Sequence, residues 1–198
     1  MTLRYLADHY FLIKKYDLCK EFAEVGLFIL QSKQKPERAE LSNFRQEIEV
    51  LRSHFYFILG KVEHVQGNDQ EAFQQYERSL SHNSKNHQTH FCLAKVNYQM
   101  GNFQAAEKHL NQVLSCHSFK DCYEAIRMLA QIKARQSNAQ RQPNETLRLF
   151  RRVLELNPKD FDANFEIAAL FEQTEPLQAL IYYEAGINIM REEIGCDK

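Results

Sequence analysis

The sequence predicts an all-helical protein, a right-handed α-solenoid of about five helix–turn–helix repeats. The first observation is an internal repeat, because Leu59–Leu80 aligns without gaps on Leu93–Leu114, 34 residues later. The identical pairs are Leu59/Leu93, Lys61/Lys95, Val62/Val96, Gly67/Gly101, Asn68/Asn102, Gln70/Gln104, Ala72/Ala106 and Leu80/Leu114. The second observation is that 198 residues contain only 6 glycines and 4 prolines. A repeat of this length with few chain-breaking residues favours stacked helices that share one core.

The spacing inside the repeat resembles the tetratricopeptide (TPR) pattern, which also has a period of about 34 residues. The matching residues are Tyr56, Leu59, Gly60, Ala72 and Tyr76. In this pattern the small residues Gly60 and Ala72 lie where the first helix of a repeat (helix A) is crossed closely by the second (helix B). Gly67 and Gly101, each followed by Asn, are predicted to end helix A in a left-handed conformation.

We expect one TPR superhelical domain over residues 1–198. Its repeats are predicted at about 2–32, 37–84, 86–118, 120–158 and 160–194. In the first repeat, Leu6-Ala7 takes the Leu-Gly position and Lys15-Tyr16-Asp17 forms the turn. In the last repeat, Ile167-Ala168 takes the same position, with Ala179 and Tyr183 on helix B. The last helix is apolar with no polar capping helix after it, so we expect the sequence to stop inside a longer array.

The second repeat contains an insertion in residues 31–50. Leu6 and Leu59 lie 53 residues apart, which is 19 more than one 34-residue period. Pro36 can open a helix, and apolar residues then recur at steps of three and four up to Val65. These features predict one long helix from about Glu37 to Gln66. Its N-terminal overhang either packs on the first repeat or docks a partner helix.

The fourth repeat is predicted to hold a polar loop, Gln136–Gln142, before Pro143 opens helix B at Glu145–Leu156. A basic rim is predicted around this loop, with a single acid, Glu145, in the same stretch. Its residues are Lys133, Arg135, Arg141, Arg148, Arg151 and Arg152. The rim is either a solvated edge or a weak contact for nucleic acid or an acidic partner, which salt would weaken.

A peptide-binding groove is predicted along the inner face of the A helices, since helical periodicity places five positions of each repeat there. The groove residues are His54, Phe57, Ile58, Lys61, His64, Gln88, Phe91, Lys95, Tyr98, Arg127, Gln131 and Phe165. Aromatic side chains flanked by charges suit an extended or helical peptide. The alternative is that some of these aromatic side chains pack against the neighbouring repeat. No alignment of the repeats supplies the cationic residues of a chaperone-tail clamp.

Other classes of function find little support in the sequence. A net charge of −1 and a pI near 6.7 argue against nucleic acid as the default partner. Five cysteines without C-x-x-C spacing argue against a disulfide framework or zinc ribbon and favour a reducing compartment. The longest apolar run, Phe22–Leu30, is too short to span a bilayer. We therefore expect no membrane contact and no small-molecule substrate.

Catalytic motifs are also absent from the sequence, which has no Gly-rich phosphate loop, no G-x-S-x-G and no H-E-x-x-H. His82, His87 and His90 lie close together but have no carboxylate or thiol nearby at metal-ligand spacing. We interpret them as solvated histidines of the loop between two repeats. We expect a protein that is not an enzyme and needs no cofactor and no metal.

Three longer stretches resemble one TPR family, the scaffold subunit of the RNA polymerase II-associated factor (Paf) complex. They are LADHYFLIKKYD (Leu6–Asp17), GNDQEAFQQY (Gly67–Tyr76) and LFEQTEPLQALIYYEAGINIM (Leu170–Met190). The resemblance implies a nuclear scaffold that binds the other Paf subunits during transcription elongation and supports histone modification. The alternative is a TPR adaptor of another intracellular assembly with a different peptide ligand.

Overall fold

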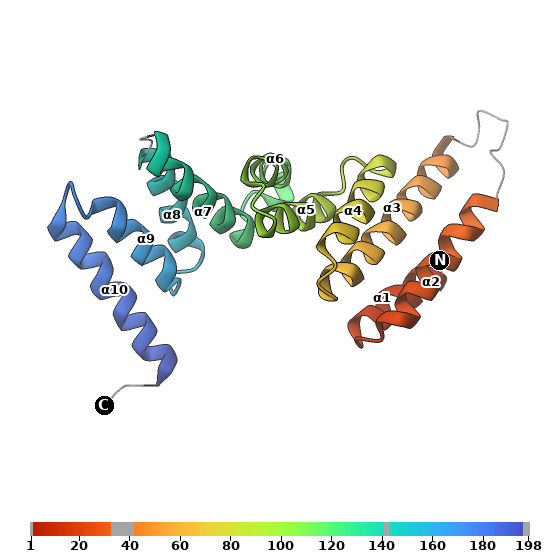
Figure 1. Cartoon of the computed structure of the whole chain (residues 1–198), viewed down its shortest axis with the longest axis horizontal. Helices are drawn as coiled ribbons and strands as arrows, with labels where there is room; N and C mark the ends of the chain where they lie inside the picture. Colours follow the sequence, from red (N-terminus) through yellow and green to blue (C-terminus); the bar gives the residue numbers. More distant parts are fainter. Residues whose placement is uncertain (1, 33–41, 141–142, 196–198) are drawn as a thin grey trace. The chain divides into compact units, whose positions relative to one another are not determined.

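The computed structural model describes residues 2–32, 42–140 and 143–195 (Figure 1). These residues form ten α-helices and one short 3-10 helix, with no strand among them. The α-helices are α1 (Thr2–Leu12), α2 (Tyr16–Ser32), α3 (Ser42–Val65), α4 (Asp69–His82), α5 (His87–Gln99), α6 (Phe103–Leu114), α7 (Tyr123–Gln140), α8 (Pro143–Leu156), α9 (Phe161–Phe171) and α10 (Pro176–Ile194). The 3-10 helix η2 is His117–Phe119. The all-helical prediction is confirmed.

The chain divides into two compact units, Met1–Gln112 and Val113–Lys198, which we call the N-terminal and C-terminal units. In the N-terminal unit α1 packs on α2, α2 on α3, α3 on α4 and α4 on α5. The first helices of successive repeats also touch, since α3 contacts both α1 and α5. In the C-terminal unit α7 packs on α8, α8 on α9 and α9 on α10. The prediction of a single domain over 1–198 stays a prediction.

Close helix crossings occur where the repeat pattern predicts them. A Cβ atom on Gly60 of α3 would lie 2.6 Å from the ring of Tyr76 on α4. Ala72, which faces this crossing from α4, is fully buried, and so is the equivalent Ala106 on α6. A second crossing that the sequence analysis did not identify places Gly26 of α2 against the ring of Phe55. The small residues therefore let the helix backbones approach with an aromatic ring between them.

The predicted left-handed stops are confirmed at the ends of α3 and α5. Gly67 has φ +81° and Gly101 has φ +78°. After α3, the amide of Asn68 donates to the carbonyl of Glu63 at 2.9 Å, and Asn102 does the same to Asn97 at 2.8 Å. These bonds from the residue after glycine are those of a Schellman motif, which satisfies the last carbonyls of a helix.

The long helix α3 begins at Ser42 in the structure. Its predicted start at Glu37, with Pro36 and Leu41, lies outside the described residues. Ile48 and Leu51 pack against the core that contains Leu27 and Leu30 of α2. The N-terminal part of α3 therefore packs on the first repeat, one of the two outcomes that the sequence allowed.

One expectation about the fourth repeat is wrong. Residues Gln136–Gln140, predicted as loop, continue α7, which ends at Gln140. The run contains polar residues but neither glycine nor proline, so nothing in it breaks a helix. Gln142, the end of the predicted loop, lies outside the described residues. The start of helix B at Pro143 is confirmed by α8.

The interpretation of His90 as a solvated loop residue is also wrong. His90 lies in α5 with only 9% of its surface exposed. Its Nε2 atom is 3.0 Å from the carbonyl oxygen of Ser84, and its Nδ1 atom is 2.9 Å from Nδ1 of His109. A carbonyl oxygen can only accept, so Nε2 of His90 donates to Ser84. Burial, then the nearby His90, lowers the pKa of His109 to about 4.

We predict that Gly60→Ala lowers the free energy of unfolding by about 1–3 kcal/mol through overpacking against Tyr76, although alanine favours an isolated helix by about 0.5–1 kcal/mol. Urea unfolding followed by circular dichroism measures the change. The same substitution in a Tyr76→Leu background should have a smaller effect. Equal effects in the two backgrounds would show that the ring is not the cause.

We predict that the N-terminal unit loses stability as the pH falls from about 6.5 to about 4. In this window the unfolded chain protonates His109 while the folded chain keeps it neutral, so acid favours unfolding. Urea unfolding across this pH range should show a weaker pH dependence for His109→Gln than for the parent. An identical pH dependence of the two proteins would show that His109 is not the cause of the loss of stability in acid.

Candidate functional site

The first helices of the N-terminal unit carry a set of half-buried aromatic and basic side chains. We call it the aromatic–lysine face. It consists of Phe11 on α1, His54 and Lys61 on α3, and Phe91 and Lys95 on α5. Seven residues separate His54 from Lys61 and four separate Phe91 from Lys95, so each pair lies on one side of its helix. Because α3 touches both α1 and α5, these three helices bring the set together.

Both lysines of this face lie against aromatic rings. The Nζ atom of Lys61 is 3.8 Å from the centre of the Phe11 ring and 5.6 Å from that of Phe57. The Nζ atom of Lys95 is 4.7 Å from the centre of the Phe91 ring. Among the described residues, no carboxylate forms an ion pair with either ammonium group. The two charges are thus held by cation–π contacts and are not neutralised by an acid.

The thiol of Cys92 is close enough to both lysines for their charges to act on its pKa. Burial raises the pKa of Cys92, while Tyr76, Lys61 and Lys95 act in the opposite direction. Burial, then the neighbouring Cys92, also raises the pKa of Tyr76. The thiol and the phenol therefore stay neutral, and the lysines supply the positive charge at this position.

His54 contributes a polar but uncharged group. Its Nε2 atom is 2.9 Å from Oδ1 of Asp8 on α1. Such a distance would fit an ion pair, but burial outweighs the attraction of Asp8 and lowers the pKa of His54. The contact at neutral pH is therefore a hydrogen bond that the neutral imidazole donates to the carboxylate. It ties α3 to α1 at the edge of the aromatic–lysine face.

Two of the predicted groove residues are in the core instead. Phe57 is 8% exposed and Ile58 is 2% exposed. Phe57 packs against Tyr76, with 6.1 Å between the ring centres. Phe57 and Ile58 therefore offer little surface to a ligand, and their part in a groove stays a prediction. The ring that Phe57 packs against belongs to its own repeat, whereas the alternative expected packing against the neighbouring repeat.

The other predicted groove residues of the N-terminal unit reach the surface. Gln88 is exposed, and His64 and Tyr98 are half-buried. Tyr98 meets the ring of Phe103 edge to face, with 5.5 Å between the ring centres. Their part in binding a peptide stays a prediction.

In the C-terminal unit, two predicted groove residues are engaged within the fold. Arg127 forms ion pairs with Asp160, at 3.1 Å from Nε to Oδ2, and with Asp162. The ring of Phe165 lies at the crossing of α9 and α10, where a Cβ atom on Gly186 would be 2.9 Å from it. Gln131 is half-buried. These residues of the C-terminal unit therefore do not form a counterpart of the aromatic–lysine face.

Asp160, which the sequence analysis did not single out, organises this part of the C-terminal unit. Asp160 is buried, with 5% of its surface exposed. Its carboxylate accepts hydrogen bonds from the hydroxyl of Tyr123 and from the backbone amide of Ala163, the latter at 2.9 Å. It thereby caps α9 and holds Arg127. An aspartate directly before an apolar helix is the only sequence signal for this role. Phe11 and Asp8, on α1, were also missed, because nothing local shows that α3 covers them.

The basic rim is partly neutralised. Arg152 bonds Glu155 and Asp121, each at 2.6 Å, and Lys133 lies 3.9 Å from Glu145. Arg135, Arg148 and Arg151 are exposed. Arg141 lies outside the described residues.

The described residues contain no group of three or more His, Cys, Asp or Glu side chains that could hold a metal ion. Within the same residues, no helix combines the length and apolar character that crossing a membrane requires.

No family model matches the sequence. The fold, however, is similar to solved structures. YrrB, described as a TPR protein with an unusual peptide-binding site, has a TM-score of 0.71 and 18% identity over 95% of this chain and 84% of its own. MamA has a TM-score of 0.66 and 12% identity over 96% and 97% of the two chains. PilF of Pseudomonas aeruginosa has a TM-score of 0.66 and 16% identity over 94% and 74%. The chain therefore has the α-solenoid fold of TPR proteins, and nothing in these similarities supports the Paf-specific resemblance.

We predict that Asp160→Ala lowers the free energy of unfolding by about 2–4 kcal/mol, because it removes a helix cap and leaves Tyr123 and Arg127 without a buried acceptor. Asp162→Ala is the matched control, since it removes the more exposed acid from the same arginine and should cost less than about 1 kcal/mol. Urea unfolding of the two variants compares them. Equal losses would show that Asp160 does not have this organising role.

Proposed function

We propose that this chain is a non-catalytic scaffold that binds a peptide segment of another protein on its aromatic–lysine face. The observation that carries the proposal is the pair of lysines, Lys61 and Lys95, held over aromatic rings without a carboxylate partner. A ligand that supplies the missing carboxylates gains two charge-assisted contacts. A ligand that also covers the half-buried rings of Phe11 and Phe91 gains apolar contact.

The expected ligand is an extended or helical peptide with acidic side chains next to apolar ones. The rings favour apolar side chains, and the two ammonium groups favour carboxylates. Each exposed ion pair contributes on the order of 0.2–1 kcal/mol, and each cation–π contact about 0.5–1 kcal/mol. Contacts of this size lead to reversible binding, with affinity that falls as the salt concentration rises. The fold shared with YrrB, whose description includes a peptide-binding site, agrees with this type of ligand.

A narrower candidate is a scaffold subunit of the Paf complex in the nucleus, with the other Paf subunits as partners. It rests on the resemblance of Leu170–Met190 and two shorter stretches alone. In the structure the Glu-Gln-Thr part of this stretch forms the turn between α9 and α10, ahead of Pro176. A TPR adaptor of another multiprotein assembly agrees with the fold equally well, and we favour this broader reading.

The test is a peptide-display selection against the chain, followed by fluorescence anisotropy of the enriched peptides. We expect enrichment of acidic side chains beside apolar ones. Lys61→Glu and Lys95→Glu should each weaken binding about tenfold, a change of ~1.4 kcal/mol. The matched control is Lys85→Glu, an exposed lysine of the same unit outside the face. Enriched peptides that bind the two face variants as tightly as the parent would place the ligand elsewhere.

A pull-down from nuclear extract with the same variants separates the two candidates. Recovery of Paf-complex subunits by the parent and by Lys85→Glu, and their loss with Lys61→Glu/Lys95→Glu, would support the narrower one. Recovery of a different assembly under the same controls would support the general adaptor.

A further inference from the structure

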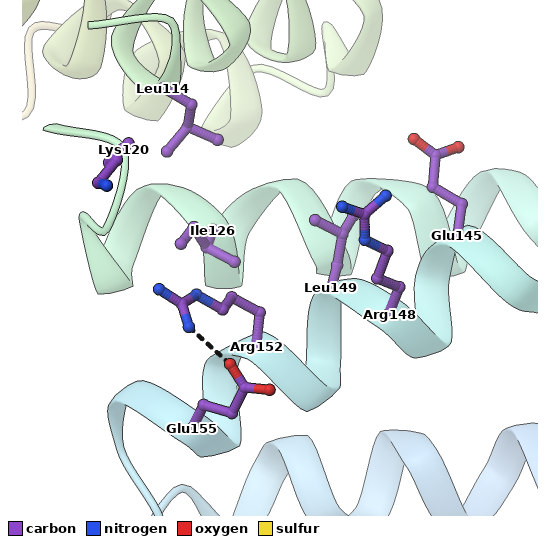
Figure 2. A pocket seen from close by; sticks show the side chains of 8 residues that line it. All are labelled: Leu114, Lys120, Ile126, Glu145, Arg148, Leu149, Arg152 and Glu155. Carbon is purple, nitrogen blue, oxygen red and sulfur yellow. Dashed lines mark hydrogen bonds and ion pairs between the residues drawn. The ribbon is translucent and has the colours of Figure 1, made fainter. Parts of the chain in front are cut away.

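A cavity of about 510 Å³ lies beside α8 in the C-terminal unit (Figure 2). We call it the α8 cavity. Its walls come from the last residue of α6, the segment after η2, and helices α7 and α8. Cavities of about 300–1,000 Å³ are typical of binding sites for small ligands. The α8 cavity therefore has room for one or two side chains of a partner.

The bottom of this cavity is aliphatic. Ile126 is 4% exposed and belongs to the core of the unit. Leu114 and Leu149 pack against the same core and are half-buried. None of the residues that line the cavity is aromatic. An aliphatic side chain would gain contact here, whereas a nucleic-acid base would find no ring on which to stack.

Some of the cations around the cavity form ion pairs and others do not. Arg152 already bonds both Asp121 and Glu155. Lys120 and Arg148 are exposed, and neither forms an ion pair with a described residue. Figure 2 shows them on opposite sides of Ile126. The cavity thus has an aliphatic bottom and an unpaired cation on either side of it.

We propose that the α8 cavity is a second docking site, which takes an aliphatic side chain of a peptide with acidic residues on both sides of it. The aliphatic side chain fills the space over Ile126 and Leu149. The flanking carboxylates approach Lys120 and Arg148. This site is separate from the aromatic–lysine face and does not depend on it.

A peptide fits this site better than nucleic acid does. Two carboxylates, Glu145 and Glu155, also line the cavity. Glu145 lies 3.9 Å from Lys133, and Glu155 forms an ion pair with Arg152. A phosphate backbone carries closely spaced charges, so it would be repelled by both acids. A short peptide can place its carboxylates at the two cations and keep them away from Glu145 and Glu155.

The test uses fluorescence anisotropy with a labelled synthetic peptide in which one leucine lies between two pairs of aspartates. Two control peptides replace the leucine by serine or the aspartates by asparagine. The protein variants are Lys120→Glu and Arg148→Glu, and the matched control is Arg151→Glu, which is exposed on α8 but does not line the cavity. All three changed side chains are exposed, and circular dichroism verifies that each variant is folded.

We expect Lys120→Glu/Arg148→Glu to weaken binding of the aspartate–leucine peptide about tenfold or more, and Arg151→Glu to weaken it less than about twofold. Both control peptides should bind more weakly than the parent peptide. Equal losses with Arg148→Glu and Arg151→Glu would overturn the proposal, because they indicate diffuse attraction to the basic rim. Tighter binding of a labelled oligothymidine than of the peptide would overturn it in favour of nucleic acid.

Lys95→Glu separates this site from the aromatic–lysine face. In the Lys95→Glu background, Lys120→Glu/Arg148→Glu should still weaken binding of the aspartate–leucine peptide about tenfold or more, because the two sites bind independently. If Lys95→Glu abolishes binding and Lys120→Glu/Arg148→Glu does not, the α8 cavity is not the site, while the proposed function of the other face stands. Absence of measurable binding by the parent protein would also overturn the proposal.

Discussion

The structure depends on helix crossings in which an aromatic ring lies against a glycine. Tyr76 lies against Gly60 within one repeat, Phe55 against Gly26 between two repeats, and Phe165 against Gly186 in the C-terminal unit. A helix pair of this kind cannot bury its apolar side alone. Tyr76 and Phe55 are buried, and Phe165 is half-buried. The crossings leave little freedom for one helix to slide along the next, because any added side chain would meet the ring. The positions of the first helices, and of the side chains on them, follow from this packing.

The same packing decides which residues of a helix remain available to a partner. On α3, Phe57 and Ile58 turn into the core, while His54 and Lys61 stay half-buried at the surface. On α7, Arg127 also reaches the surface, but Asp160 and Asp162 neutralise its charge. The lysines of the N-terminal unit have aromatic rings in place of acids as neighbours. Similar positions in successive repeats therefore differ in what they can bind.

The two candidate sites recognise related chemistry in different ways. The aromatic–lysine face offers flat rings beneath two ammonium groups, whereas the α8 cavity offers an aliphatic space between Lys120 and Arg148. Both fit acidic ligands, although the chain as a whole has a net charge of −1. Net charge is a poor guide here because several acids already bind bases within the fold, as Glu155 does with Arg152. A partner is attracted by the charged side chains that have no ion-pair partner within the fold.

By itself the sequence determined the helical class, the 34-residue repeat, the left-handed stops at Gly67 and Gly101 and the helix start at Pro143. These features depend on backbone chemistry and on spacing along the chain. Only the tertiary structure decided that His90 is buried against His109, that Lys61 lies over Phe11 and that Asp160 holds Arg127. Periodicity shows which residues share one side of a helix, but contacts between residues far apart in the chain decide what covers that side. The burial, charge and availability of each candidate residue depend on that cover.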